Sequence, residues 1–269
     1  MDKDTNYFET NRKAWNAKTS VHINSDFYDN ENFLKGKSSL KSIELDLLGE
    51  ISGKSILHLQ CHFGQDSISL SWMGAQVTGI DLSDEAIKEA QALAAQTRVQ
   101  TKFIGCNVYD LPNHLDEQFD IVFTSYGAIT WLPDLDKWAG IVSRYLKPGG
   151  KFVMVEFHPV VWMFNDEFDK VGYNYFNTGA ITETETGTYA DRLAPIRQDF
   201  VSWNHGMSEI LNGLIKHGLE VNSFKEFDYS PYNCFKHTIE MEPDKYRIKH
   251  LGNKIPMIYS ILATKKSKS

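Results

Sequence analysis

Two apolar runs in the sequence each end at a position that could bind a ligand: the first ends in a turn, and the second ends at a carboxylate. The first run, residues 56–59, leads into the turn 60–64, and the second, residues 77–80, leads to Asp81. In folds that bind nucleosides, an acid about 20 residues beyond such a turn accepts hydrogen bonds from ribose hydroxyls. The spacing therefore predicts that Asp81 binds a ligand that contains a ribose.

Side chains with acid–base chemistry follow two later apolar runs. Tyr126 comes just after the run 119–124, and His158 comes just after the run 151–157. Both are candidates for a general base, although Tyr126 could only pack over a ligand and His158 could only cap the end of a strand. Glu156 is a weaker candidate, because the strand that carries it is expected to bury it.

The first turn also contains residue types that bind zinc, namely His58, Cys61 and His62. His58 lies inside the predicted strand while the other two lie in the turn, and no fourth ligand stands at a useful spacing. We therefore expect no metal site, and we expect these side chains to line the turn. Asp66, shortly after Gly64, is expected to interact with the N-terminus of the following helix.

Alternating elements in the central part of the chain would position these side chains. Amphipathic helices, one of them capped by Ser83, alternate with short β-rich runs at 55–60, 76–81, 101–106, 119–124 and 151–157. This order is typical of a parallel sheet with helices on both faces.

Segments after residue 145 predict a turn, a helix and two more strands of the same sheet. The sequence Leu-Lys-Pro-Gly-Gly at 146–150 predicts a turn into a strand that begins at Lys151, because proline cannot continue a helix. A helix is predicted over 207–217, and the apolar runs 219–228 and 256–264 predict a closing pair of strands.

Two regions, 1–50 and 158–204, depart from this alternation. The first contains a predicted helix near 37–49. The second is rich in aromatic residues, and its Thr/Glu run at 182–188 predicts an exposed hairpin. Long insertions are commonly lids or binding loops, so we expect 158–204 to cover a ligand. The alternative is an aromatic cluster that packs only on itself.

The order of the elements resembles the class I S-adenosylmethionine-dependent methyltransferases over most of residues 40–265. In that family the first strand ends in Asp-x-Gly-x-Gly-x-Gly, and residues 58–64 read His-Leu-Gln-Cys-His-Phe-Gly, so only the last glycine is kept. Residues 103–112 resemble the third-strand motif, with Asn107 in the usual aspartate position. The segment 119–126 resembles the fourth strand and its exit into the active site.

The resemblance implies a cofactor, S-adenosyl-L-methionine, and the residues that hold it. Aromatic side chains could close over it, although core packing would explain them equally well. The implied cofactor-binding residues are Gln60, Cys61, His62, Gly64, Asp81, Leu82, Asn107, Val108, Ser125 and Tyr126, with Trp15 and Tyr28 closing over them.

The resemblance also implies an α/β fold that is Rossmann-like and doubly wound. Its seven-stranded sheet is mostly parallel with an antiparallel last strand, and an N-terminal helical segment and an inserted lid are added to it. We expect a single domain over 1–269, divided into an N-terminal cap (1–50), a cofactor-binding core (51–157), a lid (158–204) and a closing part (205–269).

The expected activity is in-line methyl transfer from the cofactor to a small-molecule acceptor. Two alternatives remain: a cofactor-binding sensor that has lost methyl transfer, and a fold kept purely for interaction. A dehydrogenase that binds a dinucleotide would also use a glycine turn and a ribose acid. That class is disfavoured, because the first turn lacks the early glycines that wrap a pyrophosphate.

The composition limits which classes of partner and which cellular compartment we expect for this protein. The chain has 269 residues, 42% hydrophobic and 23% charged, which is typical of a globular protein. Its net charge of −7 argues against nucleic acid as a partner.

The cysteines and the N-terminal residues bear on the cellular compartment. Three scattered cysteines favour a reducing cytoplasm. The first six residues are polar and no run reaches the roughly 18 apolar residues of a membrane span, so we expect a cytoplasmic protein without a membrane partner. Oligomeric state is left open.

Overall fold

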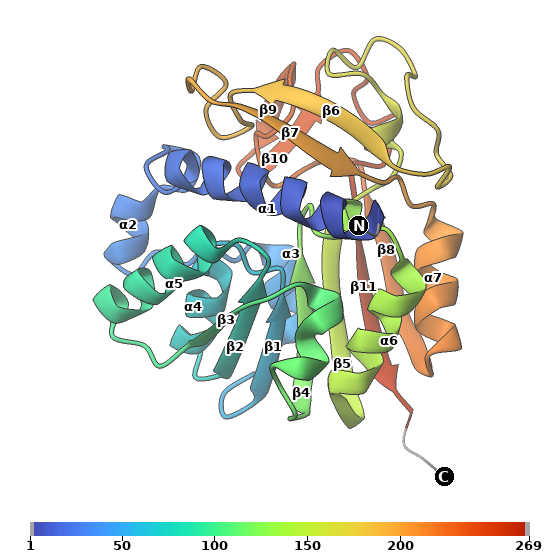
Figure 1. Cartoon of the computed structure of the whole chain (residues 1–269). Helices are drawn as coiled ribbons and strands as arrows, with labels where there is room; N and C mark the ends of the chain where they lie inside the picture. Colours follow the sequence, from blue (N-terminus) through green and yellow to red (C-terminus); the bar gives the residue numbers. More distant parts are fainter. Residues whose placement is uncertain (1–2, 267–269) are drawn as a thin grey trace.

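Seven strands form the central sheet of the computed structural model, which describes residues 3–266 (Figure 1). Residues 1–2 and the last three residues lie outside the described part. The strands follow the order β3-β2-β1-β4-β5-β11-β8. Their bounds are β1 (Ser55–Leu59), β2 (Gln76–Asp81), β3 (Lys102–Gly105), β4 (Phe119–Ser125), β5 (Leu146–Phe157), β8 (Leu219–Phe227) and β11 (Ile258–Lys265).

Neighbouring strands run parallel from β3 to β5, and β11 runs antiparallel to both β5 and β8. The predicted fold class is therefore confirmed. Strand order reverses between β1 and β4, and ligands of such open sheets bind outside the carboxyl ends of the strands at this point.

Helices cover both faces of the sheet, as the alternation predicts. α6 (Leu135–Tyr145) and α7 (Met207–Lys216) bury apolar side chains in the same cluster as Leu57 and Leu59. On the other face, α3 (Ser42–Leu48), α4 (Gln65–Trp72) and α5 (Asp84–Thr97) contribute buried side chains to other apolar clusters. Ser83 caps α5 as predicted, since its Oγ accepts a hydrogen bond from the Ala86 amide at 3.0 Å.

Two predicted boundaries are wrong. β5 begins at Leu146 and not at Lys151, because Leu146 already pairs with Phe119 and an irregularity in the ladder accommodates the Pro-Gly-Gly segment. α3 is shorter than the helix predicted near 37–49. It begins only after Lys41, whose backbone N–H donates to the Glu44 carboxylate at 2.8 Å.

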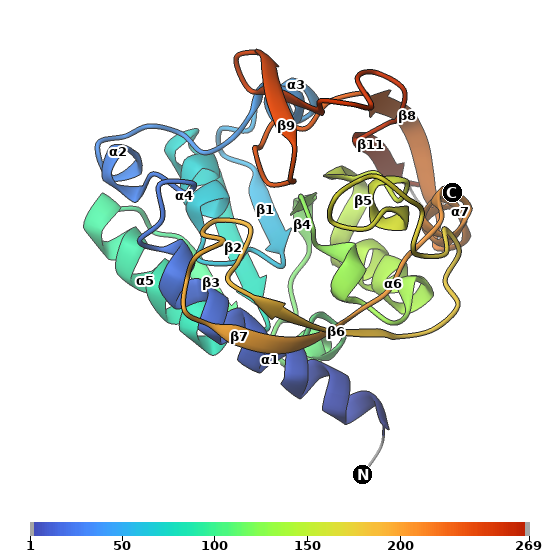
Figure 2. The ribbon, with the colours of Figure 1, turned by 90° about the horizontal axis from the view of Figure 1, so that it is seen from above.

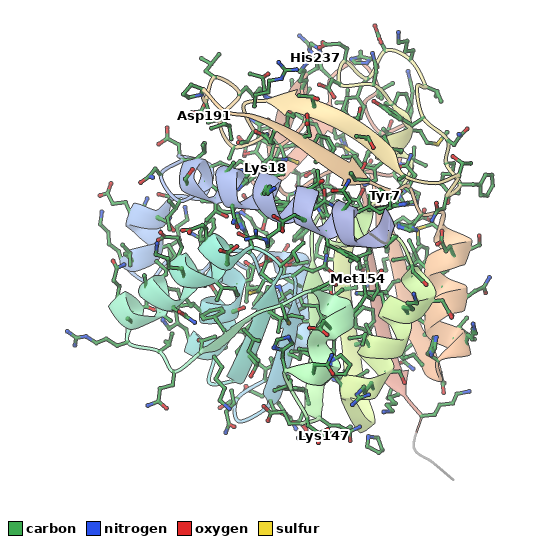
Figure 3. The ribbon with its side chains drawn as sticks, in the orientation of Figure 1. Tyr7, Lys18, Lys147, Met154, Asp191 and His237 are labelled. Atoms are coloured by element: carbon green, nitrogen blue, oxygen red, sulfur yellow. The ribbon has the colours of Figure 1, made fainter. Side chains whose placement is uncertain are left out.

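A roof lies above the carboxyl ends of the strands, as Figure 1 shows from the side and Figure 2 from above. It comprises α1 (Lys3–His22), α2 (Asn30–Leu34), the β6–β7 hairpin and the β9–β10 hairpin. Figure 3 labels Lys18 and His237 in this part, and Lys147 at the opposite end of the sheet. The hairpin strands are β6 (Ile181–Thr186), β7 (Arg197–Ser202), β9 (Thr238–Glu242) and β10 (Lys245–Ile248).

The roof differs from the prediction in two ways. The Thr/Glu run at 182–188 supplies only β6, and its partner strand β7 returns after a loop. The β9–β10 hairpin, between β8 and β11, was not predicted, because β9 has only five residues and its alternating Ile239 and Met241 are exposed. None of the helices within residues 3–266 combines the length and the apolar character needed to cross a membrane.

Candidate functional site

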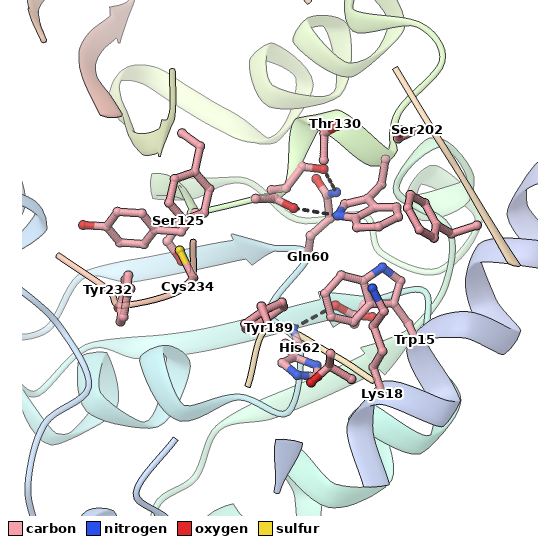
Figure 4. A pocket seen from close by; sticks show the side chains of 18 of the residues that line it. Trp15, Lys18, Gln60, His62, Ser125, Thr130, Tyr189, Ser202, Tyr232 and Cys234 are labelled. Carbon is pink, nitrogen blue, oxygen red and sulfur yellow. Dashed lines mark hydrogen bonds between the residues drawn. The ribbon is translucent and has the colours of Figure 1, made fainter. Parts of the chain in front are cut away.

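A cavity of about 810 Å³ lies between the carboxyl ends of the strands and the roof. Figure 4 shows Trp15 and Lys18 reaching into it from α1, near His62 and Tyr189. The lining brings together all of the predicted cofactor residues: Trp15, Tyr28, Gln60, Cys61, His62, Gly64, Asp81, Leu82, Asn107, Val108, Ser125 and Tyr126.

The loop after β1 has the backbone shape of a glycine turn, although two of its residues are large. φ is +57° at Gln60, +50° at His62 and +84° at Gly64. These left-handed values favour glycine, and other residues adopt them only when the surrounding structure holds them there. The loop therefore keeps the conformation of a glycine motif at all three positions, while two side chains enter the space that glycines would leave open.

Asp81 holds this loop from the end of β2. Its Oδ2 accepts a hydrogen bond from the His62 amide and its Oδ1 accepts one from the Ser83 amide, both at 2.8 Å. Burial is the largest influence on the carboxyl group and raises its pKa to about 6, although these amide hydrogen bonds act in the opposite direction. A carboxylate that lines the cavity beside this turn is placed to accept further hydrogen bonds from ligand hydroxyls.

The aromatic residues predicted to close the site surround the same loop. The Trp15 ring meets the rings of His62 and Trp131 edge-on, with centroids 5.2 Å apart in each case. Tyr28 packs against Phe63 with a centroid distance of 4.7 Å, and its hydroxyl contacts the Tyr189 hydroxyl at 2.5 Å. The N-terminal segment that carries Trp15 and Tyr28 therefore meets the hairpin loop above the turn.

The geometry does not support Tyr126 as a general base. Its hydroxyl donates a hydrogen bond to Glu44 Oε2 at 2.8 Å. Burial, followed by the negative charge of Glu44, raises the pKa of Tyr126 well above its ordinary value. The phenol therefore stays protonated, and its role is to line the cavity wall.

His158 lies outside the cavity lining, which corrects its assignment as a catalytic candidate. Its buried ring points away from the site, with Nε2 2.9 Å from Glu226 Oε1 on β8. Glu156 is buried as expected, and it accepts hydrogen bonds from the amides of Gly127, Ala128 and Ile129. It therefore supports the loop after β4.

The side chains considered for a metal are engaged elsewhere. His58 Nδ1 lies 2.8 Å from Ser67 Oγ, and His62 Nε2 lies 2.9 Å from His22 Nδ1. Within residues 3–266, the structure contains no group of three or more His, Cys, Asp or Glu side chains that could hold a metal ion.

Two polar residues of the lining were missed. Asp66 lies in the first turn of α4 as expected, but its carboxylate faces the cavity and accepts hydrogen bonds from Ser39 Oγ at 2.6 Å and from Ser125 Oγ at 2.9 Å. Lys18 lies one helical turn after Trp15, and only 5% of its side chain is exposed. That helical spacing was the available signal for Lys18, whereas nothing local pointed to the contacts of Asp66.

Residues 56–150 match a family model described as a methyltransferase domain. A ubiquinone biosynthesis O-methyltransferase of Pseudomonas syringae pv. tomato is 27% identical over 143 residues, which cover 51% of this chain and 61% of that protein. An uncharacterised methyltransferase of Synechocystis is 32% identical over 131 residues, covering 48% of this chain and 59% of that protein. The chain thus spans about three fifths of the length of these curated relatives.

Solved structures extend the comparison to the whole fold. The crystal structure of an S-adenosylmethionine-dependent methyltransferase from Mesorhizobium loti has a TM-score of 0.60 with this chain at 22% identity. The match covers 86% of this chain and 100% of that one. At this identity the likeness shows a shared fold.

Proposed function

Because the chain belongs to the class I S-adenosylmethionine-dependent methyltransferases, we propose that it transfers a methyl group from this cofactor to a small-molecule acceptor. The observation that carries the proposal is the loop after β1. This loop, with three left-handed residues, follows the strand beside which the strand order reverses, and its His62 amide binds Asp81 from the neighbouring β2. A fold kept only for interaction would have no need of this strained turn beside a large cavity.

The residues of the cavity fit the proposed cofactor. Asp81 would accept hydrogen bonds from the ribose hydroxyls, and the neighbouring Leu82, Asn107 and Val108 would border the adenine. Gln60 and His62 would border the methionine part, with Trp15 closing over it. When bound, the cofactor supplies an electrophilic methyl group on a positively charged sulfur.

The protein contributes position and exclusion of water. Methyl transfer is an in-line displacement, so a rate gain comes mainly from holding the acceptor in line with the methyl group inside a dry cavity. The roof provides that enclosure, since α1 and the β6–β7 hairpin both line the cavity. A base is needed only when the acceptor must lose a proton.

The first test is calorimetric titration with S-adenosylhomocysteine and S-adenosylmethionine. Asp81→Asn should weaken binding by about 1.5–3 kcal/mol, because charge-assisted hydrogen bonds are lost. Asp116→Asn, at an exposed position outside the cavity, is the matched control. Absence of binding to the wild type would overturn the proposed function, and unchanged affinity in Asp81→Asn would remove Asp81 from the site.

A sensor that binds the cofactor without transferring its methyl group is the second candidate. It is favoured by the two bulky residues, Gln60 and His62, at positions where the family has glycine. Transfer of labelled methyl from the cofactor to a panel of small acceptors separates the two candidates. Tight cofactor binding without any transfer would support the sensor.

A further inference from the structure

The strand β6 turns charged side chains toward the cavity. Ile181, Glu183 and Glu185 are half-buried and line the cavity, whereas the three threonines between and after them are exposed, and two of these also border the cavity. A strand with one covered face normally places apolar residues there and polar residues outside. Charged residues on the covered face are therefore a sign of ligand recognition.

Glu185 shows how this roof holds an ammonium group. The Lys18 Nζ lies 2.8 Å from Glu185 Oε2. It also lies 5.2–5.4 Å from the ring centroids of Trp15, Trp131 and Phe200. A carboxylate together with aromatic faces is a favourable environment for a cation that has lost its water.

Glu183 has similar surroundings but no ammonium group. It lies on the same face of β6, directly opposite Phe200 in the ladder with β7. The Tyr173 hydroxyl donates a hydrogen bond to its Oε1 at 2.5 Å. No ion pair joins Glu183 to a Lys, Arg or His side chain in the part of the chain that the structure describes.

In the described part of the chain, lining carboxylates without a cationic partner outnumber lining cations without a carboxylate, since Asp66 and Asp81 belong with Glu183 and only Arg192 stands against them. Asp66, on the cavity floor, likewise accepts hydrogen bonds from hydroxyl groups only. The Arg192 guanidinium, in the lining, donates to the backbone carbonyl of Cys234. Each lysine that lines the cavity already pairs with a carboxylate, namely Lys18 with Glu185, Lys37 with Asp29, Lys41 with Asp244, and Lys236 with Glu167 and Asp166.

Building on the methyltransferase function above, we propose that the acceptor carries an ammonium group, and that Glu183 binds this group as Glu185 binds Lys18. The ammonium is a recognition group, and the methyl group can go to another atom of the acceptor. A half-buried carboxylate that faces the cavity attracts a cationic group brought beside it, and the attraction grows as the bound acceptor excludes water.

The test uses three probes of similar size: 2-phenylethylamine, 2-phenylethanol and 3-phenylpropionate. Each is titrated by calorimetry into the full chain saturated with S-adenosylhomocysteine. The amine should bind about tenfold more tightly than the alcohol, and the carboxylate should bind most weakly. Glu183→Gln keeps the side-chain shape and should remove the preference for the amine. Glu220→Gln, at an exposed position on β8, should keep it.

Equal binding of the amine and the alcohol, binding of none of the probes, or an unchanged preference in Glu183→Gln would overturn the inference. The wild-type comparison needs no variant, so it decides the matter even where Glu183→Gln fails to fold. Failure of S-adenosylhomocysteine itself to bind would instead overturn the proposed function, which keeps the two results distinguishable.

Discussion

Gly64 connects the turn after β1 with the helix α4. A Cβ at this position would lie 2.7 Å from the Phe103 ring and 3.0 Å from Ala90, and φ is +84°. Two requirements therefore meet at Gly64. Its backbone is left-handed, and it packs closely against the Phe103 ring on β3 and against Ala90 on α5. The positions of Gln60 and His62 share only the first requirement, so they tolerate side chains.

Gly64→Ala should lower the free energy of unfolding by more than Gly53→Ala does. Gly53 also has positive φ, +74°, but a Cβ there would meet nothing within 4 Å. Backbone strain should cost about 1 kcal/mol at both positions, and the collision with Phe103 should add about 1–3 kcal/mol at Gly64. Urea unfolding of both variants measures the difference, and equal losses would contradict the packing argument.

Glu44 is a fully buried carboxyl behind the cavity wall. Burial, followed by the charge of Asp66, raises its pKa from 4.5 to about 7. An acid whose pKa is raised by folding stabilises the protein fully below its unfolded pKa, and this contribution is lost as the pH rises through the folded pKa. Glu44 therefore makes the folded state less stable as the pH increases from about 4.5 to 7.

Glu44→Gln should flatten the pH dependence of stability in that window. The wild type should lose about 3 kcal/mol between the two pH values through this group, and the amide variant should not. Urea unfolding at several pH values, with exposed Glu117→Gln as the control, gives the slope for each protein. Parallel slopes for the wild type and Glu44→Gln would show that Glu44 does not titrate there.

At the scale of elements, α1 and the β6–β7 hairpin act as one unit of the roof. The Asn11 side chain donates to the Val201 carbonyl at 2.7 Å and accepts from the Val201 amide at 2.8 Å. It thus pairs with β7 as a neighbouring strand would. The Lys18–Glu185 ion pair joins the same two elements, and the Tyr7 ring contacts Trp203, which directly follows β7.

Asn11→Ala should loosen the hairpin from α1. The buried N–H and C=O of Val201 would lose their partners, at a cost of about 2–4 kcal/mol for the two groups. Hydrogen exchange at the Val201 amide should accelerate accordingly. Asn24→Ala removes an exposed side-chain hydrogen bond within the N-terminal segment and should leave this amide unchanged. Equal exchange in both variants would mean that other contacts hold the hairpin.

At the scale of the whole molecule, a large cavity lies between the central sheet and a roof that is made from segments distant in the sequence. Residues of α1, the β6–β7 hairpin and the segment that includes Tyr232 and Cys234 all line it (Figure 4). A ligand enclosed there contacts the sheet and the roof together. Its binding energy should therefore stabilise the roof segments against local opening.

S-adenosylhomocysteine at about 100 times its dissociation constant should raise the free energy of unfolding by about 2.7 kcal/mol. Slower hydrogen exchange should concentrate in α1, the turn 60–64 and the β6–β7 hairpin. The opposite end of the sheet, around Lys147, should change only through global stability (Figure 3). Protection spread evenly over the molecule would contradict ligand binding beneath the roof.

The sequence by itself determined the sheet, its helices and the cofactor side of the cavity. Strand and helix periodicity are local properties, so the runs at 76–81 and 119–124 and the helix 207–217 lie where they were predicted. Parallel strands bring their carboxyl ends to one edge, so Asp81, Asn107 and Ser125 had to lie near one another.

Only the tertiary structure decided the roof and the polar contacts of the cavity. The partners of Tyr126, Lys18 and Asp66 come from segments far away in the sequence, and no spacing rule predicts them. His158 follows its strand as predicted, yet its ring points to Glu226 and away from the cavity. Local patterns fix the elements because hydrogen bonding and burial repeat along the chain. Side-chain partners depend on how loops cross, and loop conformation has no such period.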